Sequence, residues 1–195
     1  MLKKKRKKIL NARMLTTVGI LSAATIILGS TGLGFIPLPM LKLTIMHIPV
    51  IIGAIIEGPI AGGLIGLMFG LFSIFQNLTN PNLLSPAFYN PLVSVLPRVL
   101  IGIVTYYVYK AVSRFNGRLG IILGAAAGSL TNTIGVLSMI YLLYLKEYAA
   151  AKEMNIGAAV KAMLAAGMTN GVLEAVLAAF VTLPVVYSIN KINKK

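Results

Sequence analysis

Acidic residues are scarce in this sequence of 195 residues: Asp and Glu together number 4, against 18 Lys and Arg. Charged residues make up only 11% of the chain, whereas soluble domains usually carry about 25%. There is no cysteine, which excludes disulfide bonds and thiolate chemistry. With one histidine and so few carboxylates, the sequence offers no metal-ligand cluster and no carboxylate pair for acid–base catalysis. We therefore expect neither an enzyme nor a protein that needs a metal or another cofactor.

A motif that holds a nucleophilic serine and a motif that binds ATP are also missing from the chain. No Gly-x-Ser-x-Gly sequence is present to hold a nucleophilic serine, and no Gly-x-x-x-x-Gly-Lys-[Ser/Thr] loop is present to bind ATP. If the protein takes part in active transport, another subunit must therefore supply the ATPase.

Apolar residues dominate what is present, at 57% of the chain with a mean hydropathy of +0.88. A membrane-spanning helix needs roughly 20 mostly apolar residues. The pattern predicts an all-α polytopic membrane protein with six transmembrane helices, at 14–30, 44–57, 60–77, 90–109, 119–145 and 157–189. The second is short and contains Pro49, so we expect it to tilt or kink. Residues 14–190 would form one membrane domain between a basic segment at 1–13 and a basic tail at 191–195.

The distribution of basic residues predicts an orientation in the membrane. A net charge of +14 is compatible with a nucleic-acid partner, but most basic residues sit in clusters beside apolar runs, as in cytoplasmic loops. With six spans and a cytoplasmic amino terminus, 13 of the 18 basic residues fall inside. The first apolar run lacks a small-residue cleavage site, so it is interpreted as a retained helix. We expect a multi-pass cell-membrane protein with both termini cytoplasmic, in contact with lipid but not nucleic acid.

Polar residues within the predicted spans recur every four positions, which keeps them near one helix face. A charged side chain at mid-membrane costs at least about 2.5–3.5 kcal/mol, so its presence indicates a structural or functional role. The stripe of the fourth span contains Asn90, Ser94, Arg98 and Gly102. That of the fifth contains Gly120, Gly124, Gly128 and Asn132, and that of the sixth contains Ala158, Ala162, Ala166, Asn170 and Glu174. These stripes should face the bundle interior, where they are compatible with a pocket open to the outside.

Structural interpretations of the same residues remain open. Arg98 and Glu174 would then form a buried ion pair, and Asn132 and Asn170 would make hydrogen bonds between helices. His47 would be a satisfied helix-end residue. Aromatic residues at a membrane interface would account for Phe35, Phe88 and Tyr89. Simple helix packing would account for Gly62, Gly66 and Gly70.

Three segments carry a family resemblance: Gly-Phe-Ile-Pro-Leu-Pro at 34–39, Thr-Ile-Met-His-Ile-Pro-Val-Ile-Ile-Gly at 44–53, and Glu-Gly-Pro at 57–59. The chain resembles the substrate-binding S components of energy-coupling factor (ECF) vitamin transporters over roughly residues 14–190, and is most similar to the pantothenate type. The resemblance implies a subunit that binds a vitamin from outside. It would carry the vitamin inward by reorienting in the membrane, together with a T subunit and two cytoplasmic ATPases.

The resemblance also implies where ligand and partner bind. The pocket would be formed by the first loop, the loop after the third span, and the last three spans. The candidate substrate-binding residues are Arg98, Asn132, Asn170, Glu174, Asn90, Ser94, His47, Phe35 and Tyr89. Arg98 would bind the pantothenate carboxylate, whereas Glu174 would repel it unless Glu174 orients Arg98 or pairs with a ligand hydroxyl.

A docking contact with the T subunit is implied as well. The family's Ala-x-x-x-Ala motif in the first span has its nearest match in Gly19-x-x-x-Ala23, and Gly62 and Gly66 of the third span offer a second small-residue face. Three other functions remain open at this point. They are an S component for folate, riboflavin, thiamine or biotin, a self-contained channel or secondary transporter, and a structural subunit without a ligand.

Overall fold

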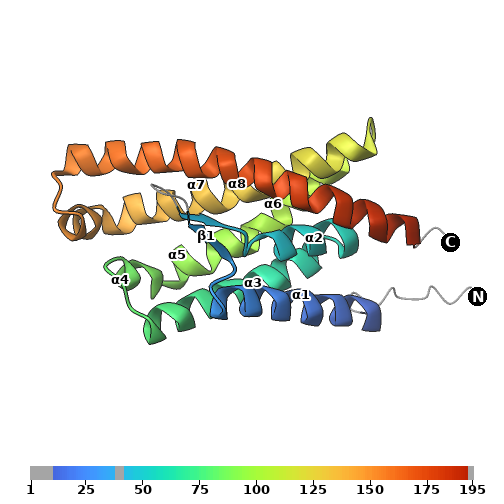
Figure 1. The fold of residues 1–195 in the computed structure, drawn as a ribbon, viewed down its shortest axis with the longest axis horizontal. Helices are drawn as coiled ribbons and strands as arrows, with labels where there is room; N and C mark the ends of the chain where they lie inside the picture. The colour runs from blue at the N-terminus through green and yellow to red at the C-terminus, as the bar shows by residue number, and fades with distance from the viewer. Residues whose placement is uncertain (1–10, 38–41, 193–195) are drawn as a thin grey trace, which may run out of the picture.

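The computed structural model describes residues 11–37 and 42–192, which are mostly helical. The predicted basic segment 1–13 and basic tail 191–195 therefore lie largely outside the described residues. The elements in chain order are α1 (Ala12–Ser30), β1 (Phe35–Pro37), β2 (Lys42–Thr44), α2 (Ile48–Glu57), α3 (Pro59–Thr79), α4 (Ser85–Phe88), α5 (Pro91–Ser94), α6 (Leu96–Val112), α7 (Gly117–Ala151) and α8 (Ile156–Ile192). The helices form an elongated bundle in which α1 begins and α8 ends at the same end (Figure 1).

Five helical segments of the described chain are long and apolar enough to cross a membrane: Ala12–Ser30, Pro59–Thr79, Pro91–Val112, Gly117–Ala151 and Ile156–Ile189. The predicted second span is wrong in its extent, because residues 42–44 form a strand and α2 has only 10 residues. At about 1.5 Å per residue, α2 is about 15 Å long, half of a hydrocarbon core of about 30 Å. The helical content is confirmed, while six full-length spanning helices are not.

The short helix α2 lies at the centre of the bundle. It packs against α1, α3, α6, α7 and α8, and Val50, Ile51 and Ala54 are fully buried. A helix that is apolar on all sides is stable where every side is covered. Pro49 stands in the first turn of α2, where no intrahelical N–H is needed, so the predicted kink does not arise there. The high hydropathy of this segment thus reflects burial in protein.

The fourth and fifth spans also differ from the sequence prediction. The chain from 90 to 112 is interrupted at Val95, between α5 and α6, and Pro91 and Pro97 occupy the first turns of these two helices. The helix α7 is kinked at Tyr144, where φ is −138° and ψ is 22°, close to the predicted end of the fifth span at 145. Beyond the kink it continues to Ala151, through residues that the sequence assigned to a polar connection. The interruption places Arg98 in the first turn of α6.

Close backbone contact between α3 and α6 depends on glycine. A Cβ at Gly62 would lie 2.8 Å from the Cα of Gly102, and a Cβ at Gly70 would lie 2.6 Å from the Cα of Val95. A side chain at Gly66 would collide with the carbonyl oxygen of Arg98. The structure thus supports the packing interpretation of these glycines, and α6 covers the face of α3 on which Gly62 and Gly66 lie.

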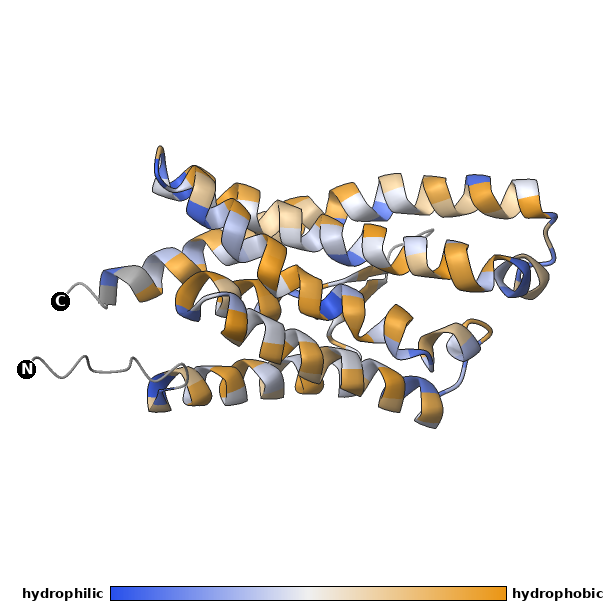
Figure 2. Cartoon of the chain, turned by 180° about the vertical axis from the view of Figure 1, so that it is seen from behind, coloured by the Kyte–Doolittle hydropathy of each residue, from blue (hydrophilic) through white to orange (hydrophobic). Residues whose placement is uncertain are grey.

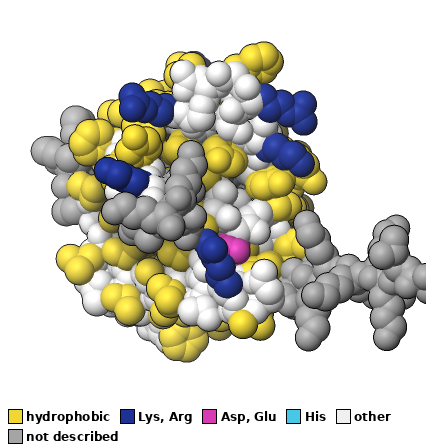
Figure 3. Space-filling view, turned by 90° about the vertical axis from the view of Figure 1, so that its right-hand side faces the viewer, with side chains coloured by type: hydrophobic (Ala, Val, Ile, Leu, Met, Phe, Trp, Pro, Cys, Tyr) yellow, Lys and Arg dark blue, Asp and Glu magenta, His cyan; other side chains and the backbone are white. Residues whose placement is uncertain are grey.

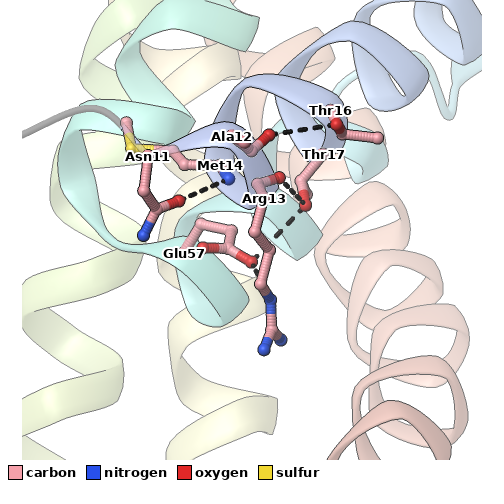
Figure 4. Close-up of polar contacts among 7 residues, drawn as sticks. All are labelled: Asn11, Ala12, Arg13, Met14, Thr16, Thr17 and Glu57. Atoms are coloured by element: carbon pink, nitrogen blue, oxygen red, sulfur yellow. Dashed lines mark hydrogen bonds and ion pairs between the residues drawn. The ribbon is translucent and has the colours of Figure 1, made fainter.

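An ion pair joins α1 and α2 at the end of the bundle where α1 begins. Arg13 Nε lies 3.0 Å from Glu57 Oε1, and Thr17 Oγ1 donates to the same oxygen at 3.4 Å (Figure 4). The Asn11 side chain caps α1 by accepting the N–H of Met14. The Arg13 side chain is 60% exposed, so the pair adds little stability. It does show that α2 returns the chain to the level at which α1 starts.

Apolar and basic residues occupy different parts of the surface. Large apolar side chains such as Phe75, Met168 and Phe180 are exposed along the helices, and hydrophilic residues concentrate toward the ends of the bundle (Figure 2). Lys and Arg side chains surround the end at which α1 begins (Figure 3). This combination is typical of a lipid-facing bundle with one basic membrane surface.

Candidate binding site

A cavity of about 380 Å³ lies among the β1–β2 hairpin, the carboxyl-terminal half of α3, the segment that follows α3, and α6 and α7. Its walls combine aromatic and apolar side chains with hydroxyl, amide and guanidinium groups. The lining residues are Phe35, Thr44, Met46, Phe69, Ser73, Gln76, Asn77, Asn80, Asn82, Phe88, Arg98 and Asn132. A concave space with a few converging polar groups is the usual form of a small-molecule site.

Arg98 supplies the cavity's positive charge. Its side chain is 7% exposed, Nη1 donates to the carbonyl oxygen of Val93 at 2.6 Å, and Nε has no partner among the described residues. The guanidinium carbon lies 5.4 Å from the centre of the Phe69 ring and 5.8 Å from that of Phe88. Both rings help to hold a cation in place. The guanidinium is therefore fixed by the protein and retains unused hydrogen-bonding capacity at the cavity.

Asn132 brings a second unused polar atom to the cavity, from α7. It is 6% exposed, and its Oδ1 has no hydrogen-bond partner in the described part of the chain. Gly120, Gly124 and Gly128, at intervals of four residues on the same helix, are all buried. A Cβ at Gly124 would lie 3.0 Å from the Cβ of Tyr109 on α6. The small residues thus let α7 approach α6, as the stripe predicted.

The resemblance implied that the loop after the third span forms part of the pocket, but the amide residues at the end of α3 and after it were not among the predicted site residues. Asn77 is the centre of this amide-rich wall, because its Oδ1 accepts from Ser85 Oγ at 2.8 Å and from Asn82 Nδ2 at 3.2 Å. Its Nδ2 donates to the carbonyl oxygen of Ser73, and Gln76 Nε2 donates to that of Gly29. The bonds from Ser85 and Asn82 tie the segment after α3 to α3 itself, and the Gln76 bond ties α3 to α1. The sequence did show a concentration of Asn and Gln side chains at 76–82. The polarity expected at the end of a helix was enough to explain it, so it did not indicate a binding site.

Glu174 on α8 accepts two hydrogen bonds, one from the hairpin and one from α7. Thr44 pairs with Phe35 in the antiparallel ladder, and its backbone N–H donates to Oε1 of Glu174 on α8 at 2.8 Å. The other carboxylate oxygen accepts from Thr133 Oγ1 on α7 at 3.2 Å. Because Glu174 and Arg98 have separate partners and form no ion pair in the described chain, the ion-pair interpretation of these two residues is wrong.

The remaining candidate residues lie around the cavity without lining it. Asn90 caps α5 and donates to the hydroxyl of Tyr144, while Ser94 donates to the carbonyl oxygen of Phe88 at 2.6 Å. Tyr89 is 39% exposed, and its hydroxyl lies 3.5 Å from the Asn77 carbonyl oxygen. Asn90 and Ser94 therefore support the segment that carries Phe88.

His47 and Asn170 differ in burial, but each has a polar side-chain atom without a hydrogen-bond partner among the described residues. His47 is fully buried at the start of α2, and neither ring nitrogen has a partner among the described residues. Asn170 is half-buried on α8, and its Oδ1 also has no partner there. Of the nine predicted substrate-binding residues, the cavity wall includes Arg98, Asn132 and Phe35.

Comparison with known proteins gives consistent matches. The family model described as "ECF transporter, substrate-specific component" matches residues 13–186. The chain is 34% identical over 171 residues to the "Pantothenic acid transporter PanT" of Lactococcus lactis subsp. cremoris MG1363, covering 80% of this chain and 81% of that protein. It is 35% identical over 115 residues to the "Pantothenate transporter PanT" of Leuconostoc mesenteroides, covering 53% of this chain and 55% of that protein.

Proposed function

Since this integral membrane protein belongs to the substrate-specific (S) components of ECF transporters, we propose that it binds pantothenate from outside the cell and delivers it inward. The two pantothenate transporters to which it is similar support the choice of vitamin. The main support for the proposal is a cavity lined by Arg98 and Asn132. Two buried polar atoms of these residues, Arg98 Nε and Asn132 Oδ1, have no hydrogen-bond partner among the described residues. Uncompensated burial of such groups is unfavourable, so a polar ligand that pairs with them is stabilised.

The cavity chemistry suits a small organic anion with neutral polar groups. Pantothenate has a carboxylate, hydroxyls and an amide. The carboxylate would accept hydrogen bonds from Arg98, and the first turn of α6 adds the positive end of the helix dipole. Asn132 Oδ1 would accept a hydrogen bond from a ligand hydroxyl or amide N–H. Phe35, Phe69 and Phe88 would cover the apolar part of the ligand.

The proposed topology has six crossings and cytoplasmic termini. The hairpin and α2 together take the chain back to the level of the start of α1, which is the support for counting them as the second crossing. The exposed basic residues near helix ends, Arg13, Lys110, Arg114, Arg118 and Lys191, favour a cytoplasmic location for this end.

The proposed transport mechanism needs partners: as an S component, the chain would act together with a membrane T subunit and two ATPases. Gly19 and Ala23 are exposed on α1, and an added Cβ at Gly19 would meet no described atom within 4 Å. A flat, small-residue face of this kind allows another helix to approach closely. Because α6 covers Gly62 and Gly66, the docking proposal uses only α1.

Uptake into proteoliposomes tests the proposal against a self-contained transporter. The chain alone should bind radiolabelled pantothenate without concentrating it. Together with a T subunit and both ATPases, it should concentrate pantothenate only when ATP is supplied. Concentrative or leak-like uptake by the chain alone, independent of ATP, would contradict the S-component mechanism and favour a channel or secondary transporter.

A further inference from the structure

Glu174 is a buried acid beside the binding cavity, on a helix that contributes no lining residue. It is 5% exposed, and no Lys, Arg or His nitrogen of the described chain lies within 4.0 Å of its carboxylate. Its two oxygens are instead used by Thr44 N–H at 2.8 Å and Thr133 Oγ1 at 3.2 Å. Two hydrogen bonds, and no ion pair, therefore compensate the burial of this carboxylate.

The bond to Thr44 links segments 130 residues apart and reaches the cavity wall directly. Thr44 is the last residue of β2 and the ladder partner of Phe35, and both residues line the cavity. Thr133 lies on the same helix as Asn132, one residue further along α7. One carboxylate thus joins the strand that supplies Thr44 to the helix that supplies Asn132.

We propose that Glu174 is a positioning residue that holds Thr44 and Phe35 against the cavity and does not itself contact the ligand. The bonds to Thr44 and Thr133 engage both carboxylate oxygens, one from each neighbouring segment. In this arrangement both carboxylate oxygens are used within the protein, so Glu174 acts through the strand and needs no contact with the anionic ligand. The inference rests on the proposed function only for the identity of the ligand.

Substitutions can separate the geometry of Glu174 from its charge. In Glu174→Gln, Oε1 can still accept from Thr44 N–H, and Nε2 can donate to Thr133 Oγ1. Glu174→Ala loses both bonds, and Thr133→Val loses one of them with little change in volume. Glu147→Ala is the matched control, because Glu147 is an exposed acid on α7.

The test combines amide hydrogen exchange in the peptide that contains Thr44, measured without ligand, with pantothenate Kd, both on the purified full chain. In Glu174→Ala, exchange should accelerate about tenfold or more and the Kd should rise by a similar factor, as for loss of hydrogen bonds to a charged group. Glu174→Gln should stay within about threefold of wild type, and Thr133→Val should fall between the two. Glu147→Ala should match wild type.

Two results would overturn the proposal. If Gln and Ala weaken binding equally while exchange at Thr44 stays unchanged, Glu174 acts on the ligand through its charge. If neither variant changes exchange, the bond does not hold the strand. Should Glu174→Ala fail to fold, Glu174→Gln and Thr133→Val still decide between these outcomes. Hydrogen exchange is measured without ligand, so it tests the role of Glu174 even if the wild-type protein does not bind pantothenate. Failure of the wild type to bind would refute only the vitamin assignment.

Discussion

Arg98 shows how one residue sets the chemistry of the cavity. Its charge is buried, it has no acidic partner among the described residues, and two aromatic rings and one carbonyl oxygen hold it in place. An unpaired buried cation is costly in a membrane protein. A ligand carboxylate would offset that cost, so an anionic ligand would gain affinity that a neutral analogue could not obtain.

Arg98→Ala should weaken pantothenate binding by at least about 30-fold, since losing one partner of a buried charge pair costs about 2–5 kcal/mol. Arg98→Lys should lie in between, because a lysine ammonium cannot form the planar two-point contact of a guanidinium. Titration calorimetry on the purified variants measures both effects. Arg114→Ala, an exposed arginine outside the cavity, is the control. Equal affinities of wild type and Arg98→Ala would rule out Arg98 as the anion site.

Among individual residues, the charged and polar side chains within the apolar spans were the easiest to identify from the sequence as candidates. Arg98 and Asn132 were found because polar side chains in an apolar span need a reason. Asn77 and Asn82 were missed because polarity is ordinary at a helix end. Glu174 was found as a buried acid, but only tertiary structure could show that its partner is a backbone N–H 130 residues away.

The pairing of α3 with α6 is the decisive feature at the scale of elements, because it places Phe69 beside Arg98. Gly62 and Gly66 allow this pairing by leaving room for the backbone of α6, and Gly70 leaves room for the backbone of Val95 just before α6. The long apolar helices were predictable from hydropathy. The half-length α2 and the hairpin were not, since an apolar run buried in protein looks the same in sequence as one that faces lipid.

Gly66→Ala should destabilise the protein by about 1–3 kcal/mol, the usual cost of overpacking, and should weaken binding by displacing α6. Gly19→Ala, where an added Cβ meets no described atom within 4 Å, should leave both properties close to wild type. Thermal unfolding in detergent compares the two variants. A Gly66→Ala protein as stable as Gly19→Ala would show that the α3–α6 contact is looser than described.

A bulky residue on the exposed face of α1 should separate binding from transport. Ala23→Leu should retain wild-type pantothenate affinity, because Ala23 lies on the outer surface of the chain. In proteoliposomes with the T subunit and ATPases, the same variant should lose most ATP-dependent uptake, since a large side chain prevents close helix contact. Ile27→Ala, a change toward a smaller residue on the same helix, is the control. Wild-type uptake by Ala23→Leu would place the docking face elsewhere.

The proposed orientation of the whole molecule rests on its charge distribution and on an even number of crossings. The chain contains no native cysteine, so single cysteines can be labelled without background. Leu33 and Phe115 are 69% and 90% exposed, beyond opposite ends of the long helices. A membrane-impermeant maleimide should label Leu33→Cys in intact cells and Phe115→Cys only after permeabilisation. The reverse pattern would invert the topology, and labelling of both in intact cells would contradict the odd number of crossings that the proposed topology places between them.

The central claim is that the isolated chain binds pantothenate in the cavity that contains Arg98. Its most direct test is the thermal stability of the purified protein against a panel of vitamins. A ligand that binds only the folded state raises the melting temperature with increasing concentration. We predict a selective increase with pantothenate that is lost in Arg98→Ala. A folded protein that responds to folate, riboflavin, thiamine or biotin, and not to pantothenate, would contradict the vitamin assignment. No response to any of them would contradict the binding function itself.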